Sequence, residues 1–159
     1  MQNKEKYNNQ RYYMEQAILE AKKAYKKDEV PVGAIIVKDG KILACKHNTV
    51  EKNQNAIHHA EILAINEASK KIKSWRLNDA TMYVTLMPCK MCIGAIENSR
   101  ISEVIYLCEK PDNLNYSNKY INKKDIFKKY INNNQENEIY SEYIEMLKEF
   151  FKEIRNGKK

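Results

Sequence analysis

The sequence predicts an α/β protein in which helices on both sides enclose a sheet, a three-layer α/β/α sandwich that begins with an antiparallel hairpin. Two β-rich runs, 30–38 and 41–47, flank Asp39-Gly40, and this dipeptide favours a tight hairpin because both turn positions need positive φ. Residues 59–107 then alternate helix, strand, helix and strand, which implies parallel strands with right-handed crossovers. A chain of 159 residues has the usual size of one domain, so we expect residues 1–159 to form a single domain.

The individual elements follow from the spacing of apolar residues. Helices are expected where apolar residues recur every three or four positions, at 8–27, 59–73, 88–98 and 141–155. Beyond the hairpin, strands are expected at 81–86 and 104–107. The region 110–159 is less regular. It is expected to hold a lysine-rich helix or loop at 118–130, a turn at 132–137 and a last helix with Ser141 as its N-cap.

The charge of the chain favours an anionic partner. Lys and Arg total 28 against 21 acidic residues, a net charge of +7, which is typical of nucleic-acid binding and also of a solvated lysine-rich surface. Basic residues are densest at 119–129, where phosphate contact is one interpretation. Trp75, next to Arg76, fits either a stacking platform for bases or a core position.

No segment indicates export or membrane insertion. The N-terminus is polar, and the longest apolar stretch, Val30 to Val37, is far shorter than the ~20 residues that a membrane span needs. We therefore expect a cytoplasmic protein without membrane contact. Thiols stay reduced in that compartment, so the four cysteines are candidates for metal binding or catalysis before disulfides.

Three residues have the chemistry and spacing of a zinc site. Cys89 and Cys92 are three positions apart at the start of a helix, so both sulfurs project to the same side. His59 begins another helix, and helix N-termini gather at the carboxyl edge of parallel strands. One nitrogen and two sulfurs suit zinc and leave its fourth position for water, as in catalytic sites. Cys45 and Cys108 are each alone in a strand and are expected to be core residues.

Glu61 is the candidate proton carrier. It lies two residues after His59, which places the two side chains ~200° apart on a regular helix, so Glu61 is a poor co-ligand. Zinc lowers the pKa of its water to ~7, and a neighbouring carboxylate then acts as general acid and base. The sequence therefore predicts a hydrolytic zinc site with Glu61 as the group that moves protons.

The same residues carry a family resemblance. His59-x-Glu61 followed by Pro88-Cys89-x-x-Cys92 is the known signature of zinc-dependent base deaminases. Over about residues 10–107 the sequence resembles the bacterial tRNA-specific adenosine deaminases. Five further segments stand in the order seen in that family: Val30–Ala34, His47-Asn48, Ser74–Leu77, Tyr83–Leu86 and Ser99–Ile101.

The resemblance implies a fold, a reaction and partners. It implies a cytidine-deaminase-like fold with a five-stranded mixed sheet, one Zn²⁺ per subunit and a homodimer. It also implies deamination of the wobble adenosine of a tRNA anticodon loop to inosine. By the same resemblance the zinc ligands are His59, Cys89 and Cys92, Glu61 is the proton shuttle, and Asn48 contacts the substrate nucleotide.

Two other functions stay open from the sequence. The chain departs from the family at residues 107–113, where the family has an RNA-contacting loop, and at Met87, where the family typically has Glu. A deaminase of free nucleobases or nucleosides, such as guanine or cytosine, is therefore the first alternative. A non-catalytic, zinc-stabilised RNA-binding module is the second, and the retained Glu61 argues against it.

Overall fold

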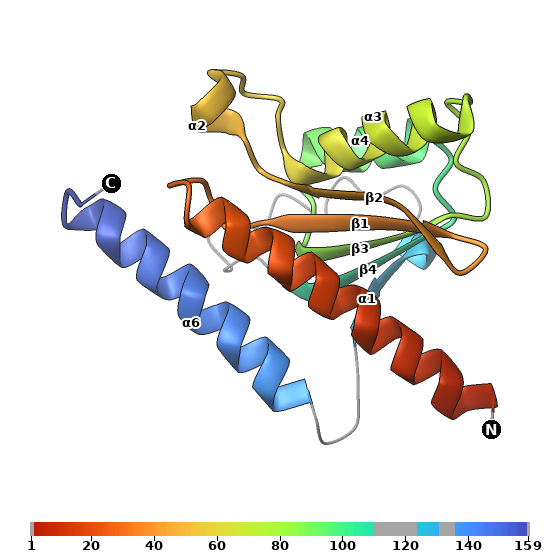
Figure 1. Ribbon diagram of the computed structural model, residues 1–159, viewed down its shortest axis with the longest axis horizontal. Helices are drawn as coiled ribbons and strands as arrows, with labels where there is room; N and C mark the ends of the chain where they lie inside the picture. Colours follow the sequence, from red (N-terminus) through yellow and green to blue (C-terminus); the bar gives the residue numbers. More distant parts are fainter. Residues whose placement is uncertain (1, 110–123, 131–135, 159) are drawn as a thin grey trace.

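The computed structural model describes residues 2–109, 124–130 and 136–158. Its strands form one five-stranded sheet in the order β2-β1-β3-β4-β5 (Figure 1). The strands are β1 (Gly33–Lys38), β2 (Lys41–His47), β3 (Thr81–Leu86), β4 (Glu103–Cys108) and β5 (Phe127–Lys129). The helices are α1 (Gln2–Tyr25), α2 (Val50–Asn53), α3 (Ala60–Ile72), α4 (Lys90–Asn98) and α6 (Glu136–Arg155), with a 3₁₀ turn η2 at Lys124–Ile126.

The sheet is mixed, as expected. β1 pairs antiparallel with β2 and with β3, whereas β3, β4 and β5 run parallel. Asp39 and Gly40 both have positive φ, 50° and 71°, so the predicted hairpin turn is confirmed. β3 also has the predicted bounds. The parallel half of the sheet matters for function because its helices start beside the carboxyl ends of the strands.

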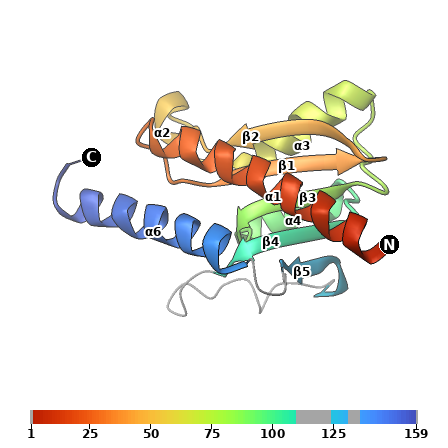
Figure 2. The same cartoon turned by 60° about the horizontal axis from the view of Figure 1, so that its bottom comes forward.

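Two helical layers enclose the sheet, which confirms the three-layer sandwich. On one face, alanines of α3 pack against β1 and β3, and Ile96 of α4 joins the same cluster. On the other face, α1 and α6 pack against alternate residues of the same strands, including Ile35 and Tyr83. Figure 2 shows β5 at the lower edge of the sheet. That residues 1–159 form one domain stays a prediction.

The C-terminal part of the chain differs from the expectation. Phe127–Lys129, expected within a helix or loop, is a strand that pairs with β4. The last helix starts at Glu136, so the N-cap expected at Ser141 and the turn expected at 136–137 are wrong, while 132–135 of that turn lie outside the described residues. The reason is that Ile139, which precedes Ser141, is buried and lies on the same apolar face of α6 as the buried Tyr143. α1 likewise starts at Gln2, before the expected residue 8.

The sheet and α1 approach each other closely at Gly33. A Cβ on Gly33 would lie 1.9 Å from the carbonyl oxygen of Ala17 and 2.7 Å from the backbone nitrogen of Ala21. Both alanines are fully buried in α1. Glycine is therefore required at this position so that the backbones of α1 and β1 can pack directly against each other.

We expect Gly33→Ala to lower the free energy of unfolding by about 3 kcal/mol, because α1 must move away from the sheet. Denaturant unfolding measures the change. Gly94→Ala is the matched control, since no atom lies within 4 Å of its added Cβ and alanine favours the α4 helix. Equal losses of stability in the two variants would contradict the close approach at Gly33.

Candidate active site

The candidate site lies where α3 and α4 begin, next to the carboxyl end of β3. His59 is the N-cap of α3 and Cys89 is the N-cap of α4, both with extended backbone angles. Cys92 lies in the first turn of α4. The two segments expected to carry chemistry, although thirty residues apart in sequence, therefore meet at one edge of the sheet.

The three candidate ligands have the spacing of a tetrahedral zinc site. Nδ1 of His59 lies 3.6 Å from Sγ of Cys89 and 3.6 Å from Sγ of Cys92. All three ligand atoms lie within 4.8 Å of one another. Tetrahedral Zn–N and Zn–S bonds of ~2.05 and ~2.3 Å would separate nitrogen and sulfur by about 3.6 Å. The residues present therefore fit a zinc ion in both donor chemistry and distance.

The pKa values of the two cysteine thiols shift in opposite directions. The hydrogen bond from Cys92, helped by His59, lowers the pKa of the Cys89 thiol to about 3. The same hydrogen bond, together with burial, raises the pKa of Cys92. The lowered pKa favours the thiolate form of Cys89, which is the form that binds metal.

Glu61 is buried beside these ligands. Its side chain belongs to the first turn of α3 and is 3% exposed. Burial raises the pKa of its carboxyl group above the usual value. Its Oε2 atom is buried and has no hydrogen-bond partner among the described residues. A buried carboxylate oxygen without a partner costs free energy, and a bound water or substrate group would satisfy it.

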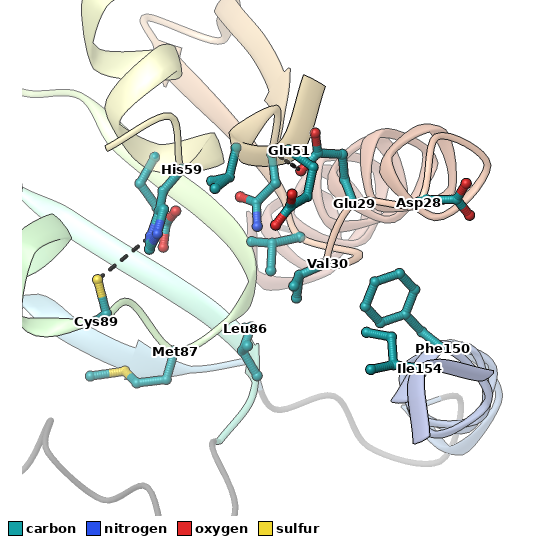
Figure 3. A pocket seen from close by; sticks show the side chains of 14 residues that line it. Asp28, Glu29, Val30, Glu51, His59, Leu86, Met87, Cys89, Phe150 and Ile154 are labelled. Atoms are coloured by element: carbon teal, nitrogen blue, oxygen red, sulfur yellow. Dashed lines mark hydrogen bonds between the residues drawn. The ribbon is translucent and has the colours of Figure 1, made fainter. Parts of the chain in front are cut away.

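A cavity of about 650 Å³ opens above these residues, a volume typical of small-molecule sites. His59, Glu61 and Cys89 form its floor. Apolar side chains form much of its walls: Val30, Val32, Val50, Leu86, Met87 and Phe150. In Figure 3, Phe150 and Ile154 of α6 lie across the cavity from His59. Asp28, Glu29 and Glu51 also line the cavity, and the apolar side chains between these acids and the polar floor suit a flat, aromatic ligand.

Asn48, expected to contact substrate, lies in the wall of this cavity. Its side chain is buried, and its Oδ1 accepts a hydrogen bond of 2.8 Å from the backbone N–H of Ala60. That donor belongs to the first residue of α3, next to His59. Asn48 therefore holds the start of the helix that carries His59 and Glu61, a contact that sequence reasoning did not anticipate.

α6 completes the cavity from the far end of the chain. The hydroxyl of Tyr143, a fully buried residue, donates a hydrogen bond of 3.0 Å to the carbonyl of Pro31. Phe150 packs against Tyr25 of α1 with ring centroids 6.1 Å apart. These contacts hold α6 against the segment that precedes β1, so Phe150 and Ile154 become part of the wall.

The remaining candidates lie outside the site. The ring of His58 lies 2.9 and 3.0 Å from the side-chain amides of Asn53 and Asn55, so it is not one of the clustered ligands. Cys45 is half-buried in β2, and Cys108 is buried in β4. In the basic stretch, Lys119 and Lys123 lie outside the described residues, while Lys128 pairs with Glu103.

The core interpretation of Trp75 is wrong. Its side chain is 52% exposed in the loop after α3. The guanidinium carbon of Arg76 lies 4.2 Å from the ring centroid, and that of Arg100 lies 5.5 Å away, both within cation–π range. This loop follows the C-terminal end of α3 and is therefore remote from His59 at the opposite end of that helix.

Comparison with known proteins identifies the family. The profile of the MafB19-like deaminases matches residues 8–155. The chain belongs to this deaminase family. The matched residues of this MafB19-like deaminase include both helix starts of the site and the whole of α6.

Relatives of this MafB19-like deaminase include tRNA adenosine deaminases and a guanine deaminase. The tRNA-specific adenosine deaminase of Bacillus subtilis (strain 168) is 43% identical over 154 residues, which cover 92% of this chain and 91% of that protein. A solved structure from studies of A-to-I editing by tRNA:A34 deaminases has 40% identity and a TM-score of 0.62, covering 63% of this chain and 77% of the other. The structure of guanine deaminase from Bacillus subtilis is 26% identical with a TM-score of 0.62. This match covers 85% of this chain and 93% of the other.

No helix among the described residues is both long and apolar enough to cross a membrane.

Proposed function

We propose that this protein is a zinc-dependent hydrolase that converts the wobble adenosine of a tRNA anticodon to inosine and releases ammonia. The observation that carries the chemistry is the set of three ligand atoms at zinc spacing beside the unpartnered carboxylate oxygen of Glu61. The family match and the 43% identity to a tRNA-specific adenosine deaminase support the choice of substrate.

In this proposal His59, Cys89 and Cys92 hold one zinc ion per subunit. A zinc ion bound there would make water nucleophilic near neutral pH. Glu61 accepts the proton of the attacking water as oxygen adds to C6 of adenine, and transfers it to N1 of the ring. Glu61 then takes the remaining proton from the hydroxyl group on C6 and delivers it to the amino group, so that the C6–N bond breaks, the C6=O bond forms and ammonia leaves. Adenosine and water thus give inosine and ammonia, with Glu61 returned to its starting state.

The cavity supplies the rest of the reaction. Val30, Val50 and Phe150 are placed to contact the faces and edges of a flat base and to exclude bulk water. The Oδ1 atom of Asn48 is bound to the N–H of Ala60, so Asn48 is proposed to bind the nucleotide through its Nδ2 group. Exclusion of water strengthens the interaction between the charged groups of the floor and the reacting ring.

The proposal includes a single-domain subunit, a homodimer and a cytoplasmic location, where tRNA is found. Exposed apolar side chains near the starts of α3 and α4 support self-association: Ile57 is 53% exposed and Met91 is 37% exposed. Metal analysis should find one zinc per subunit, and light scattering should find twice the subunit mass of 18.8 kDa.

The test is a substrate panel with the purified zinc-loaded protein. We expect ammonia and inosine from an anticodon stem-loop that carries wobble adenosine, and much less product from free adenine, guanine or cytosine. Product from a free base alone would overturn the tRNA assignment in favour of a free-base deaminase. No product from any substrate, with zinc bound, would overturn the catalytic proposal and leave the zinc-stabilised RNA-binding module.

A further inference from the structure

One wall of the cavity is a single helical turn that has no buried residue and no side-chain cap. Val50 and Glu51 line the cavity, and both belong to α2, which has only four residues. None of these residues is buried, and the N-cap Thr49 makes no side-chain capping bond. An isolated turn of this length is unstable, because helix nucleation is unfavourable and its first N–H groups lack partners. Another part of the chain must therefore stabilise it.

Glu29, from the segment between α1 and β1, supplies those partners. Its carboxylate accepts hydrogen bonds from the backbone N–H of Glu51 at 3.1 Å and of Lys52 at 2.7 Å. Glu29 is 1% exposed and also lines the cavity. Figure 3 shows Glu29 and Glu51 side by side in the wall. A charged acceptor on two N–H groups makes stronger bonds than a neutral one.

The turn held by Glu29 is connected to the catalytic residues. The backbone N–H of Thr49 donates to the carbonyl of His58 at 3.1 Å, which ties α2 to the residue before His59. Asn48, which precedes the turn, binds the first N–H of α3. The wall and the start of α3 therefore share one network, with Glu29 as its anchor on the side of α1.

We propose that Glu29 is a positioning residue for substrate binding, which acts by fixing α2 as a wall of the base pocket. This inference rests on the proposed deaminase function. Glu29 is not one of the clustered metal ligands, and its two carboxylate oxygens are engaged by α2. Its loss should therefore weaken the fit of the base without removing zinc or the proton shuttle.

Steady-state kinetics on the anticodon stem-loop test the proposal. Glu29→Ala removes both acceptors and should raise KM by about 10-fold with kcat changed by less than about 3-fold, because the wall contacts substrate and transition state alike. Glu29→Gln keeps one acceptor oxygen, so its KM should lie between the KM of wild type and that of Glu29→Ala. Zinc content should stay at the wild-type value in both variants.

Glu20→Ala is the matched control. Glu20 is also a buried glutamate, 7% exposed, whose carboxylate accepts hydrogen bonds from Lys23 and from Nδ1 of His47. It does not line the cavity. Its substitution should lower thermal stability and leave KM unchanged. The same KM in Glu29→Ala and in wild type, or the same rise in KM in Glu20→Ala, would overturn the positioning role.

Amide hydrogen exchange separates this inference from the proposed function, because it requires no activity. Glu29→Ala should speed exchange at Glu51 and Lys52 and leave the amides of α3 and α4 protected. Unchanged exchange in α2, or an equal increase throughout the protein, would overturn the inference. A wild-type protein that deaminates nothing would overturn the function alone, and the exchange pattern would still decide the role of Glu29.

Discussion

Glu61→Gln should lower kcat for deamination by at least about 10³-fold while the protein keeps its zinc and its fold, because an amide cannot carry the proton between water and the base. Glutamine has nearly the same size as glutamate, so the packing around this residue, which is 3% exposed, is preserved. Ammonia release under single-turnover conditions measures the chemical step, and metal analysis measures the zinc.

Glu97→Gln is the control for this substitution. Glu97 lies in α4 and also has a buried carboxylate oxygen with no hydrogen-bond partner among the described residues, yet it does not line the cavity. We expect wild-type kcat from this variant. Zinc loss in Glu61→Gln would show that Glu61 is a ligand, and near-normal turnover would show that another group moves the proton.

Cys92→Ser should weaken zinc binding by at least about 100-fold and abolish deamination, since a hydroxyl replaces one of two thiolates. Cys92 is fully buried, and its Sγ lies 3.6 Å from Nδ1 of His59. Metal content after dialysis against a weak chelator, and the melting temperature with and without added zinc, measure the loss.

The matched variant is Cys108→Ser, which replaces another buried cysteine, outside the ligand cluster. It should change stability slightly and keep one zinc per subunit. If Cys92→Ser also kept one tightly bound zinc, His59, Cys89 and Cys92 would not be the ligand set. Loss of zinc from both variants would instead indicate a general loss of folding.

The parts of the molecule that depend on neighbours in sequence were predicted well. Asp39-Gly40 specifies its turn by backbone conformation alone, and β3 is a short apolar run that ends two residues before a proline. The candidate site was also foreseen, because Cys89 and Cys92 are close in sequence and parallel strands bring His59 to the same edge. The spacing of the two cysteines and the rule that helix starts meet at the carboxyl edge of parallel strands were sufficient to predict this site.

The parts that depend on distant contacts were missed. β5 is a strand with two lysines among three residues, and only its pairing with β4 makes it a strand. The start of α6 is set by burial of Ile139 and Tyr143 against the sheet, which overrides the capping tendency of Ser141. Sequence analysis did not single out Glu29, because its role depends on two backbone groups more than twenty residues away.

The position of Phe150 and Ile154 has a consequence for how the protein is synthesised. Glu61 and all three candidate zinc ligands leave the ribosome well before α6 does, whereas α6 forms one side of the cavity. A nascent chain can therefore contain a metal site that is open to water and to foreign thiols until α6 docks. The zinc ligands are therefore available to metal before the wall that α6 contributes, and this wall forms only once α6 has left the ribosome.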